Sequence, residues 1–233
     1  MPLTITYLGH SGFLFDDGHD RGRLCVDPFL TGNPKAKHTP EDIDCDYVAF
    51  THGHADHFNP GGWSIARRCE ATCIANYEIG EYLDDKVGLE DCLRGNPGGS
   101  VPTDFGHVAF TPAIHSSSYE GTYLGVACGF VLHFDRVGTS GVTVYHAGDT
   151  ALFGDMQLIG QLAQPDVALL PAGGRFTMSA KLASKAAELI QPKLAVPIHW
   201  GTFDLLAQDV SDFQPVGVEA KAVVPGESWT VGD

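Results

Sequence analysis

Residues 51–57 read Thr-His-Gly-His-Ala-Asp-His and directly follow the apolar, strand-like run Tyr47-Val48-Ala49-Phe50. Four of these residues carry nitrogen or oxygen donors: His52, His54, Asp56 and His57. Neither an extended chain nor a helix would bring all four side chains to one point, because each form divides them between faces. A strand that ends near Phe50 and turns into a helix after Pro60 would let two donors face one metal ion and two face another. The segment therefore predicts a metal site, and it is a reason to look for two ions.

Three more donors follow apolar, strand-like stretches further along the chain. Residues 108–114 lead into His115, residues 142–148 lead into Asp149, and residues 194–198 lead into His199. Strand ends and the loops beyond them are where sheet proteins build sites, because a rigid scaffold positions a loop that makes no sheet hydrogen bonds. Any one of the three alone would more often be structural. Together with residues 51–57 they indicate one shared site.

Seven donors are too many for a single ion. Zinc usually accepts about four ligands, and a catalytic zinc keeps one position for water. Seven donors suit two ions with one bridging carboxylate and an open bridging position for a water or hydroxide. The donors are nitrogen and oxygen only, so zinc, manganese and iron are all possible, and we expect zinc.

These residues resemble the metallo-β-lactamase-fold hydrolases. The match is His-x-His-x-Asp-His at 52–57, followed by His115, Asp149 and His199 in the order and approximate spacing of that superfamily. Neighbouring phrases are similar to the branch that resembles L-ascorbate-6-phosphate lactonase, many of whose members have no known substrate. These phrases are Thr-Pro-Ala-Ile-His-Ser-Ser-Ser (111–118), Tyr-His-Ala-Gly-Asp-Thr (145–150), Arg-Phe-Thr-Met (175–178) and Ile-His-Trp-Gly-Thr-Phe (198–203). The resemblance covers nearly the whole chain.

The resemblance implies an α/β fold, a four-layer αββα sandwich with the metals at one edge between two sheets. It also implies which residues hold the metals. His52, His54 and His115 would hold one ion, and Asp56, His57 and His199 would hold the other. Asp149 would bridge the two ions.

The pattern of the rest of the chain agrees with a sandwich. Strand-like runs at residues 5–8, 13–15, 24–26, 129–134 and 167–170 alternate with helical stretches. The clearest helix is predicted over 179–190, with Ser179 as its N-cap and Pro192 as its stop. Two more helices are predicted, one after Asn76 and one over 156–162.

Composition bounds the remaining properties. No linker or low-complexity run divides the chain, so one hydrolase domain over residues 1–233 is expected. No apolar run approaches the roughly 20 residues that cross a bilayer, and the N-terminus begins with a strand-like run, so we expect a cytoplasmic protein. The six cysteines include no Cys-x-x-Cys pair and are expected to be free thiols.

A formal net charge of −15 argues against a nucleic-acid surface and against anionic membranes. A small-molecule substrate fits this charge better. Superfamily relatives are often oligomeric, so a homo-oligomer is an open alternative, although no self-complementary surface can be identified in the sequence.

The expected reaction is hydrolysis of a small-molecule lactone, ester, amide or phosphodiester by a metal-bridging hydroxide. Asp56 would help to orient that nucleophile. His10, in Leu-Gly-His-Ser-Gly, would contact the substrate or carry a proton beside the metals. Arg175 would bind an anionic part of the substrate.

Two alternatives to a dinuclear hydrolase stay open. The first is an iron-dependent oxidoreductase of the same fold that acts on thiols or persulfides. The second is a metal-binding protein without turnover, which the intact set of seven donors disfavours.

Overall fold

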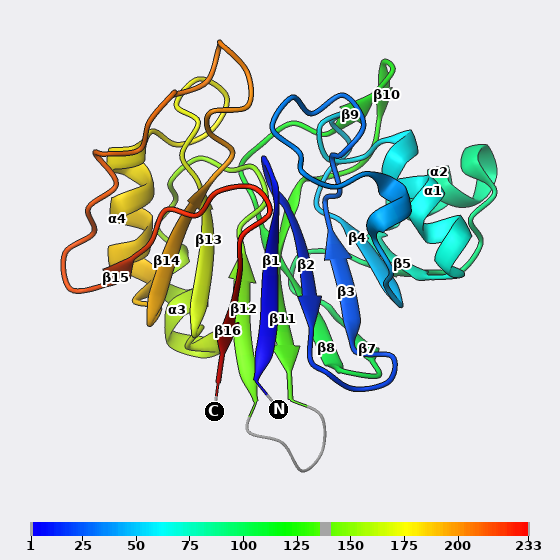
Figure 1. Ribbon diagram of the computed structural model, residues 1–233, viewed down its shortest axis with the longest axis horizontal. Helices are drawn as coiled ribbons and strands as arrows, with labels where there is room; N and C mark the ends of the chain where they lie inside the picture. The colour runs from blue at the N-terminus through cyan, green and yellow to red at the C-terminus, as the bar shows by residue number, and fades with distance from the viewer. Residues whose placement is uncertain (1, 136–140, 233) are drawn as a thin grey trace.

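Two seven-stranded sheets lie face to face at the centre of the protein (Figure 1). The structure is a computed structural model that describes residues 2–135 and 141–232. In strand order, the first sheet comprises β16 (Ser228–Val231), β1 (Leu3–Gly9), β2 (Gly12–Asp16), β3 (Arg23–Val26), β4 (Tyr47–Phe50), β5 (Thr72–Asn76) and β6 (Cys92–Gly95). The second comprises β15 (Glu219–Ala220), β14 (Leu194–Ile198), β13 (Val167–Pro171), β12 (Val142–His146), β11 (Cys128–Phe134), β8 (Gly106–Pro112) and β7 (Ser100–Thr103). A separate hairpin pairs β9 (Ser118–Tyr119) with β10 (Thr122–Tyr123).

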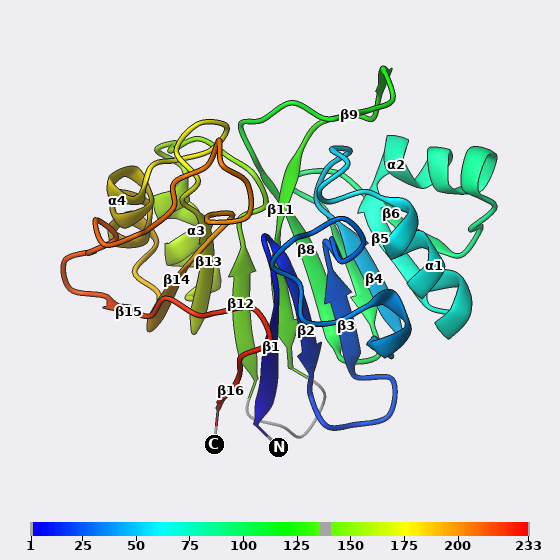
Figure 2. The same cartoon turned by 45° about the horizontal axis from the view of Figure 1, so that its top comes forward.

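Helices cover the outer face of each sheet. Helices α1 (Pro60–Cys69) and α2 (Tyr77–Tyr82) pack on the first sheet, and α3 (Met156–Ala163) and α4 (Ala180–Ile190) pack on the second (Figure 2). Two short helical turns, η1 (Pro40–Asp42) and η2 (Leu83–Val87), lie near α1 and α2. The buried apolar residues divide accordingly into three clusters, one between the sheets and one beneath each helical layer. The predicted four-layer αββα sandwich is confirmed.

Local signals in the sequence fix the helix ends. Helix α4 begins after Ser179, whose hydroxyl accepts the N–H of Leu182 at 3.4 Å, and it ends at Gln191 in the left-handed conformation before Pro192. Helix α1 begins after Asn59, whose side chain accepts the N–H of Gly62 at 3.1 Å. The predicted helix over 179–190 is therefore confirmed, with Ser179 as the N-cap and Ala180 as the first helical residue.

Glycine lets α1 pack closely on β4. A Cβ atom at Gly62 would lie 2.8 Å from the ring of Phe50, so a larger residue would push the helix away. Phe58, fully buried, also packs against Phe50 with ring centroids 5.1 Å apart. These contacts hold both ends of the loop that carries residues 51–57.

Strand direction brings the predicted donors to one edge. In the first sheet β1, β3 and β4 run the same way, because β2 is antiparallel to both β1 and β3 while β3 and β4 are parallel. In the second sheet β8 runs the same way as β12, β13 and β14, since β11 is antiparallel to both β8 and β12. The carboxyl ends of these strands point to the upper edge in Figure 1.

All six cysteines are free thiols, as predicted. Among the helices that the structure describes, none is long and apolar enough to cross a membrane.

Candidate metal site

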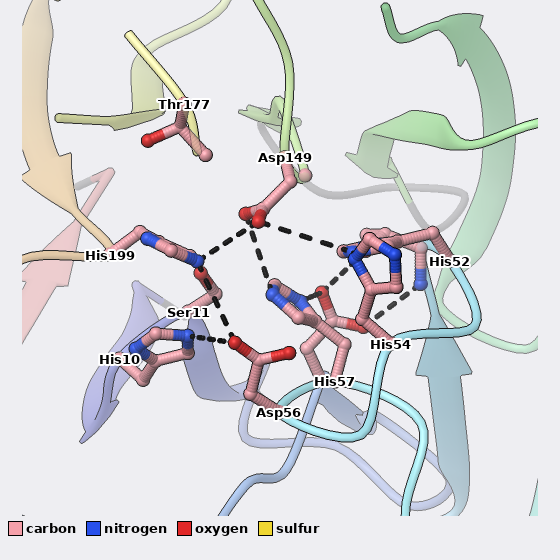
Figure 3. Close-up of polar contacts among 12 residues, drawn as sticks. His10, Ser11, His52, His54, Asp56, His57, Asp149, Thr177 and His199 are labelled. Carbon is pink, nitrogen blue, oxygen red and sulfur yellow. Dashed lines mark hydrogen bonds and ion pairs between the residues drawn. The ribbon is translucent and has the colours of Figure 1, made fainter. Parts of the chain in front are cut away.

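The predicted donors meet at the carboxyl edge of the two sheets (Figure 3). The loop between β4 and α1 supplies the four donors of residues 52–57, and a turn in which Phe58 N–H donates to the His54 carbonyl at 2.7 Å shapes it. The other three lie just beyond β8, β12 and β14, namely His115, Asp149 and His199.

Three imidazoles converge in a first cluster. His52 Nε2 lies 3.0 Å from His54 Nδ1, which lies 3.2 Å from His115 Nε2. Ligand nitrogens about 2.0–2.1 Å from a tetrahedral zinc lie roughly 3.3–3.4 Å from one another. The three nitrogens therefore have the spacing of ligands that share one ion.

A second cluster contains His10, Asp56, His57 and His199, whose ligand atoms all lie within 4.8 Å of one another. Asp56 Oδ2 is 3.1 Å from His10 Nε2 and 3.9 Å from His199 Nε2. This group can hold a second cation. It includes His10, which the sequence predicted beside the metals and not as a ligand.

Asp149 joins the two clusters. Its Oδ2 atom lies 2.9 Å from His199 Nε2, 3.6 Å from His115 Nε2 and 4.0 Å from His52 Nε2. Its Oδ1 atom lies 3.4 Å from His57 Nε2. The carboxylate thus contacts members of both clusters, which is the placement that a bridging ligand requires.

Several atoms of the site are buried and lack a hydrogen bond in the described part of the chain. These atoms are His57 Nε2, Asp149 Oδ1, His199 Nδ1 and His199 Nε2. Leaving a buried polar atom unsatisfied costs about 1–3 kcal/mol each, so a cluster of them needs a compensating partner. A cation coordinated by the Nε2 atoms and the carboxylate would supply it for three of the four atoms, all but His199 Nδ1.

Burial and neighbouring charges set the protonation of the site. Burial lowers the pKa of His52 well below its usual value and keeps this imidazole neutral. For Asp149 burial acts in the opposite direction, but His199 and His57 hold the pKa of the carboxyl well below its usual range. For His57 burial is outweighed by Asp149 and Asp27, which raise the pKa of the imidazole well above its usual value.

Two residues that the sequence did not predict orient the candidate ligands. Asp27, directly after β3, accepts from His57 Nδ1 at 2.8 Å and from the Thr51 hydroxyl at 2.6 Å. Because the Thr51 hydroxyl donates to Asp27, its oxygen accepts from His52 Nδ1 at 3.0 Å. In their neutral form both imidazoles therefore carry the proton on Nδ1 and turn Nε2 into the site. The sequence feature that could have indicated Asp27 is its position directly after a strand, which it shares with the seven donors.

His10 is fully buried and linked to both sheets. Burial, assisted by His199, lowers the pKa of His10 to about 4, so the ring is neutral near neutral pH. A carboxylate only accepts, so His10 Nε2–H donates to Asp56 at 3.1 Å and the Thr202 hydroxyl donates to His10 Nδ1 at 3.0 Å. Thr202 is a further residue that the sequence analysis missed.

Arg175 lies on the loop after β13, and its side chain is exposed. Its guanidinium lies over the ring of Phe176 at 5.5 Å. Within residues 2–135 and 141–232 no hydrogen bond or ion pair joins Arg175 to the donor cluster, so its substrate contact stays a prediction.

Comparison with known proteins places the chain in a family. The profile described as a Beta-lactamase superfamily domain matches residues 4–199. A UPF0173 metal-dependent hydrolase of Methanopyrus kandleri is 42% identical over 233 residues, covering 97% of this chain and 99% of that protein. One from Methanosarcina mazei is 40% identical and covers 97% of each chain. The structure of Igni18, a metallo hydrolase from Ignicoccus hospitalis, is similar with a TM-score of 0.86 and 35% identity over 100% of both chains.

The fold and the donor cluster together define a metal-dependent hydrolase of the β-lactamase superfamily. Within this superfamily the chain belongs to the UPF0173 metal-dependent hydrolases. The prediction of this enzyme class is confirmed. The finer resemblance to L-ascorbate-6-phosphate lactonase stays a prediction.

Proposed function

We propose that the protein is a dinuclear hydrolase that cleaves a lactone, ester, amide or phosphodiester in a small molecule. The observation that carries the proposal is the position of Asp149, whose two oxygens lie 2.9–4.0 Å from imidazoles of both donor clusters. In this proposal the whole chain is one hydrolase domain, acting in the cytoplasm.

Six residues besides Asp149 would hold the ions. His52, His54 and His115 are assigned to one ion, and Asp56, His57 and His199 to the other. Zinc is the expected metal; because the donors are nitrogen and oxygen only, manganese and iron are alternatives. When bound, two such ions would lower the pKa of coordinated water and polarise the bond under attack.

The chain itself orients these groups. Asp27 and Thr51 fix the tautomers of His57 and His52, so that the free nitrogens face the ions. His10 donates to Asp56 Oδ2 and thereby orients that carboxylate beside His199. Burial alone would raise the pKa of Asp56, but the hydrogen bond from His10 holds it well below its usual range. The carboxylate is therefore a weak acceptor for a proton from a nucleophile, and it acts chiefly by orientation.

The open side of the site defines how a substrate enters. His52, His57, Asp149 and His199 are buried, whereas His54, Asp56 and His115 are half-buried. A small molecule would therefore approach over the half-buried residues His54, Asp56 and His115. With 29 acidic against 14 basic residues, the surface favours a small substrate over a nucleic acid.

The first experiment is elemental mass spectrometry on the wild type and on Asp149→Ala. The proposal expects about two ions per chain in the wild type, with loss of activity and of at least one ion in the variant. Asp204→Asn, an exposed site on the loop after β14, is the matched control and should keep both ions. Full activity with two ions retained in Asp149→Ala would refute the bridging role.

A further inference from the structure

A pocket of about 190 Å³ opens beside His10, which is also a member of the second donor cluster. It lies between the loop after β3, the loop after β14 and the segment that precedes β16, around the upper end of β1 in Figure 1. Drug-sized ligands fill about 300–1,000 Å³, so this pocket accommodates only a small group or one end of a larger molecule.

The lining is mainly apolar. Tyr7, Trp200, Val223 and Pro225 are among its lining residues, and the polar ends of the two rings are already engaged. The amide nitrogen of Gln208, which also lines the pocket, donates to the Phe203 and Leu206 carbonyls. The Tyr7 hydroxyl donates to the His10 carbonyl at 2.9 Å, and Trp200 Nε1 donates to the Pro197 carbonyl at 3.0 Å. These side chains therefore present hydrocarbon and ring faces to whatever occupies the pocket.

One cation borders this apolar wall. Lys35 lines the pocket, whereas no Asp or Glu does so, in a chain with a net charge of −15. Across residues 2–135 and 141–232, seven lysines and arginines form ion pairs with carboxylates, and Lys35 is among the remaining ones, which form none. An ammonium without a carboxylate partner at the edge of an apolar pocket is suited to an anion carried on an apolar group.

We propose that this pocket binds a carboxylate attached to a small apolar group, and that this group is one end of the substrate. Lys35 would pair with the carboxylate, and the rings and valines would pack on the hydrocarbon. A single ammonium matches a monoanion, whereas recognition of a phosphate usually gathers more donors. The assignment of this group to the substrate rests on the proposed hydrolase function.

The pocket adjoins the metal cluster through shared side chains. His10 and Thr202 both line the pocket, and His10 Nε2 also contacts Asp56 at 3.1 Å. A substrate end held here would be separated from Asp56 by one imidazole ring. The pocket is therefore placed to select which molecules present a bond to the metals.

The test uses metal-loaded protein with labelled valine methyl groups and follows the signals of Val223 and Val224 by NMR. The probes are benzoate, its neutral analogue benzamide, and phenyl phosphate. Benzoate should shift both valine signals saturably, and benzamide and phenyl phosphate should bind more weakly. Lys35→Met should weaken benzoate binding about fivefold and leave benzamide unchanged, since an exposed ion pair contributes up to about 1 kcal/mol. Lys86→Met, an exposed lysine on η2, is the matched control and should change neither.

Three results would overturn the proposal: no valine shift up to the solubility limit of benzoate, equal weakening in the two lysine variants, or tighter binding of phenyl phosphate than of benzoate. The valine signals need no turnover. Lys35-dependent benzoate binding without hydrolysis of any ester would count against the hydrolase proposal alone. The preference for carboxylate-bearing over neutral esters is the ratio of their kcat/KM values. If the protein hydrolyses esters and this ratio is the same in the wild type and Lys35→Met, the result would count against the pocket alone.

Discussion

The backbone N–H of His199 donates to the backbone carbonyl of His10 at 2.7 Å, and this bond joins the two sheets at the metal site. Both residues adopt the left-handed conformation, with φ of 59° and 60°, and their rings lie 4.0 Å apart. Left-handed backbone costs a residue other than glycine roughly 1 kcal/mol or more and persists only where the surroundings impose it. The two histidines, one from each sheet, are therefore fixed relative to each other by the main chain.

His10→Ala tests whether His10 positions Asp56 or binds a metal itself. We expect turnover to fall about 10-fold to 100-fold with both ions retained, because the imidazole acts through its hydrogen bond to Asp56. Activity and metal content are measured on the same preparation. His10→Asn is the companion variant, since asparagine tolerates the left-handed conformation and offers an N–H to Asp56. Loss of one ion in both variants would instead identify His10 as a ligand.

Asp27→Asn tests the orientation of two ligands at once. The substitution keeps the size of the side chain but removes the charge that accepts from His57 and Thr51. We expect metal affinity to fall about 10-fold to 100-fold, as for other partners of metal-bound imidazoles. Competition with a chromogenic chelator measures this affinity. Asp42→Asn, which removes an exposed carboxylate on η1, serves as the control. An affinity equal to that of the wild type would show that Asp27 does not orient the ligands.

The sequence predicted the seven donors because each lies directly after an apolar strand, a pattern visible without knowledge of the fold. Asp27 has the same position, but a single carboxylate before Pro28 is equally typical of a turn. Its role depends on the neighbouring positions of β3 and β4, which bring it beside Thr51. Strand pairing between distant segments is the information that local periodicity lacks.

The same limit explains why Thr202 and the His10–His199 bond were not predicted. They join segments almost two hundred residues apart, and they depend on the packing of one sheet on the other. The left-handed conformations of His10, Asp27 and His199 carry only a weak signal, because Asp and His are merely enriched in this region, whereas glycine enters it freely.

Gly173→Ala should displace His199. A Cβ atom at residue 173 would clash with the carbonyl oxygen of His199 and lie 2.8 Å from its Nδ1. We expect a loss of about 1–3 kcal/mol in the free energy of unfolding together with weaker metal binding. Gly174→Ala is the matched control: it has φ of 84° and open space around it, so it should cost about 1 kcal/mol without loss of metal. Equal metal content in the two variants would contradict this role of Gly173.

Metal binding should weaken as the pH falls. In the metal-free protein the carboxylates of Asp149 and Asp27 outweigh burial and raise the pKa of His57 well above its usual value, so His57 carries a second proton near neutral pH. A metal binds only the neutral imidazole, and each binding event at this cluster therefore releases a proton. At pH values below the raised pKa of His57, the affinity for the metal should fall about tenfold for each unit by which the pH decreases, because one proton must leave for each ion bound. Isothermal titration of zinc in buffers of different ionisation enthalpy counts the released protons. In Asp27→Asn, which lacks one of the two carboxylates, fewer protons should be released at the same pH; an unchanged number would show that Asp27 does not hold the proton on His57.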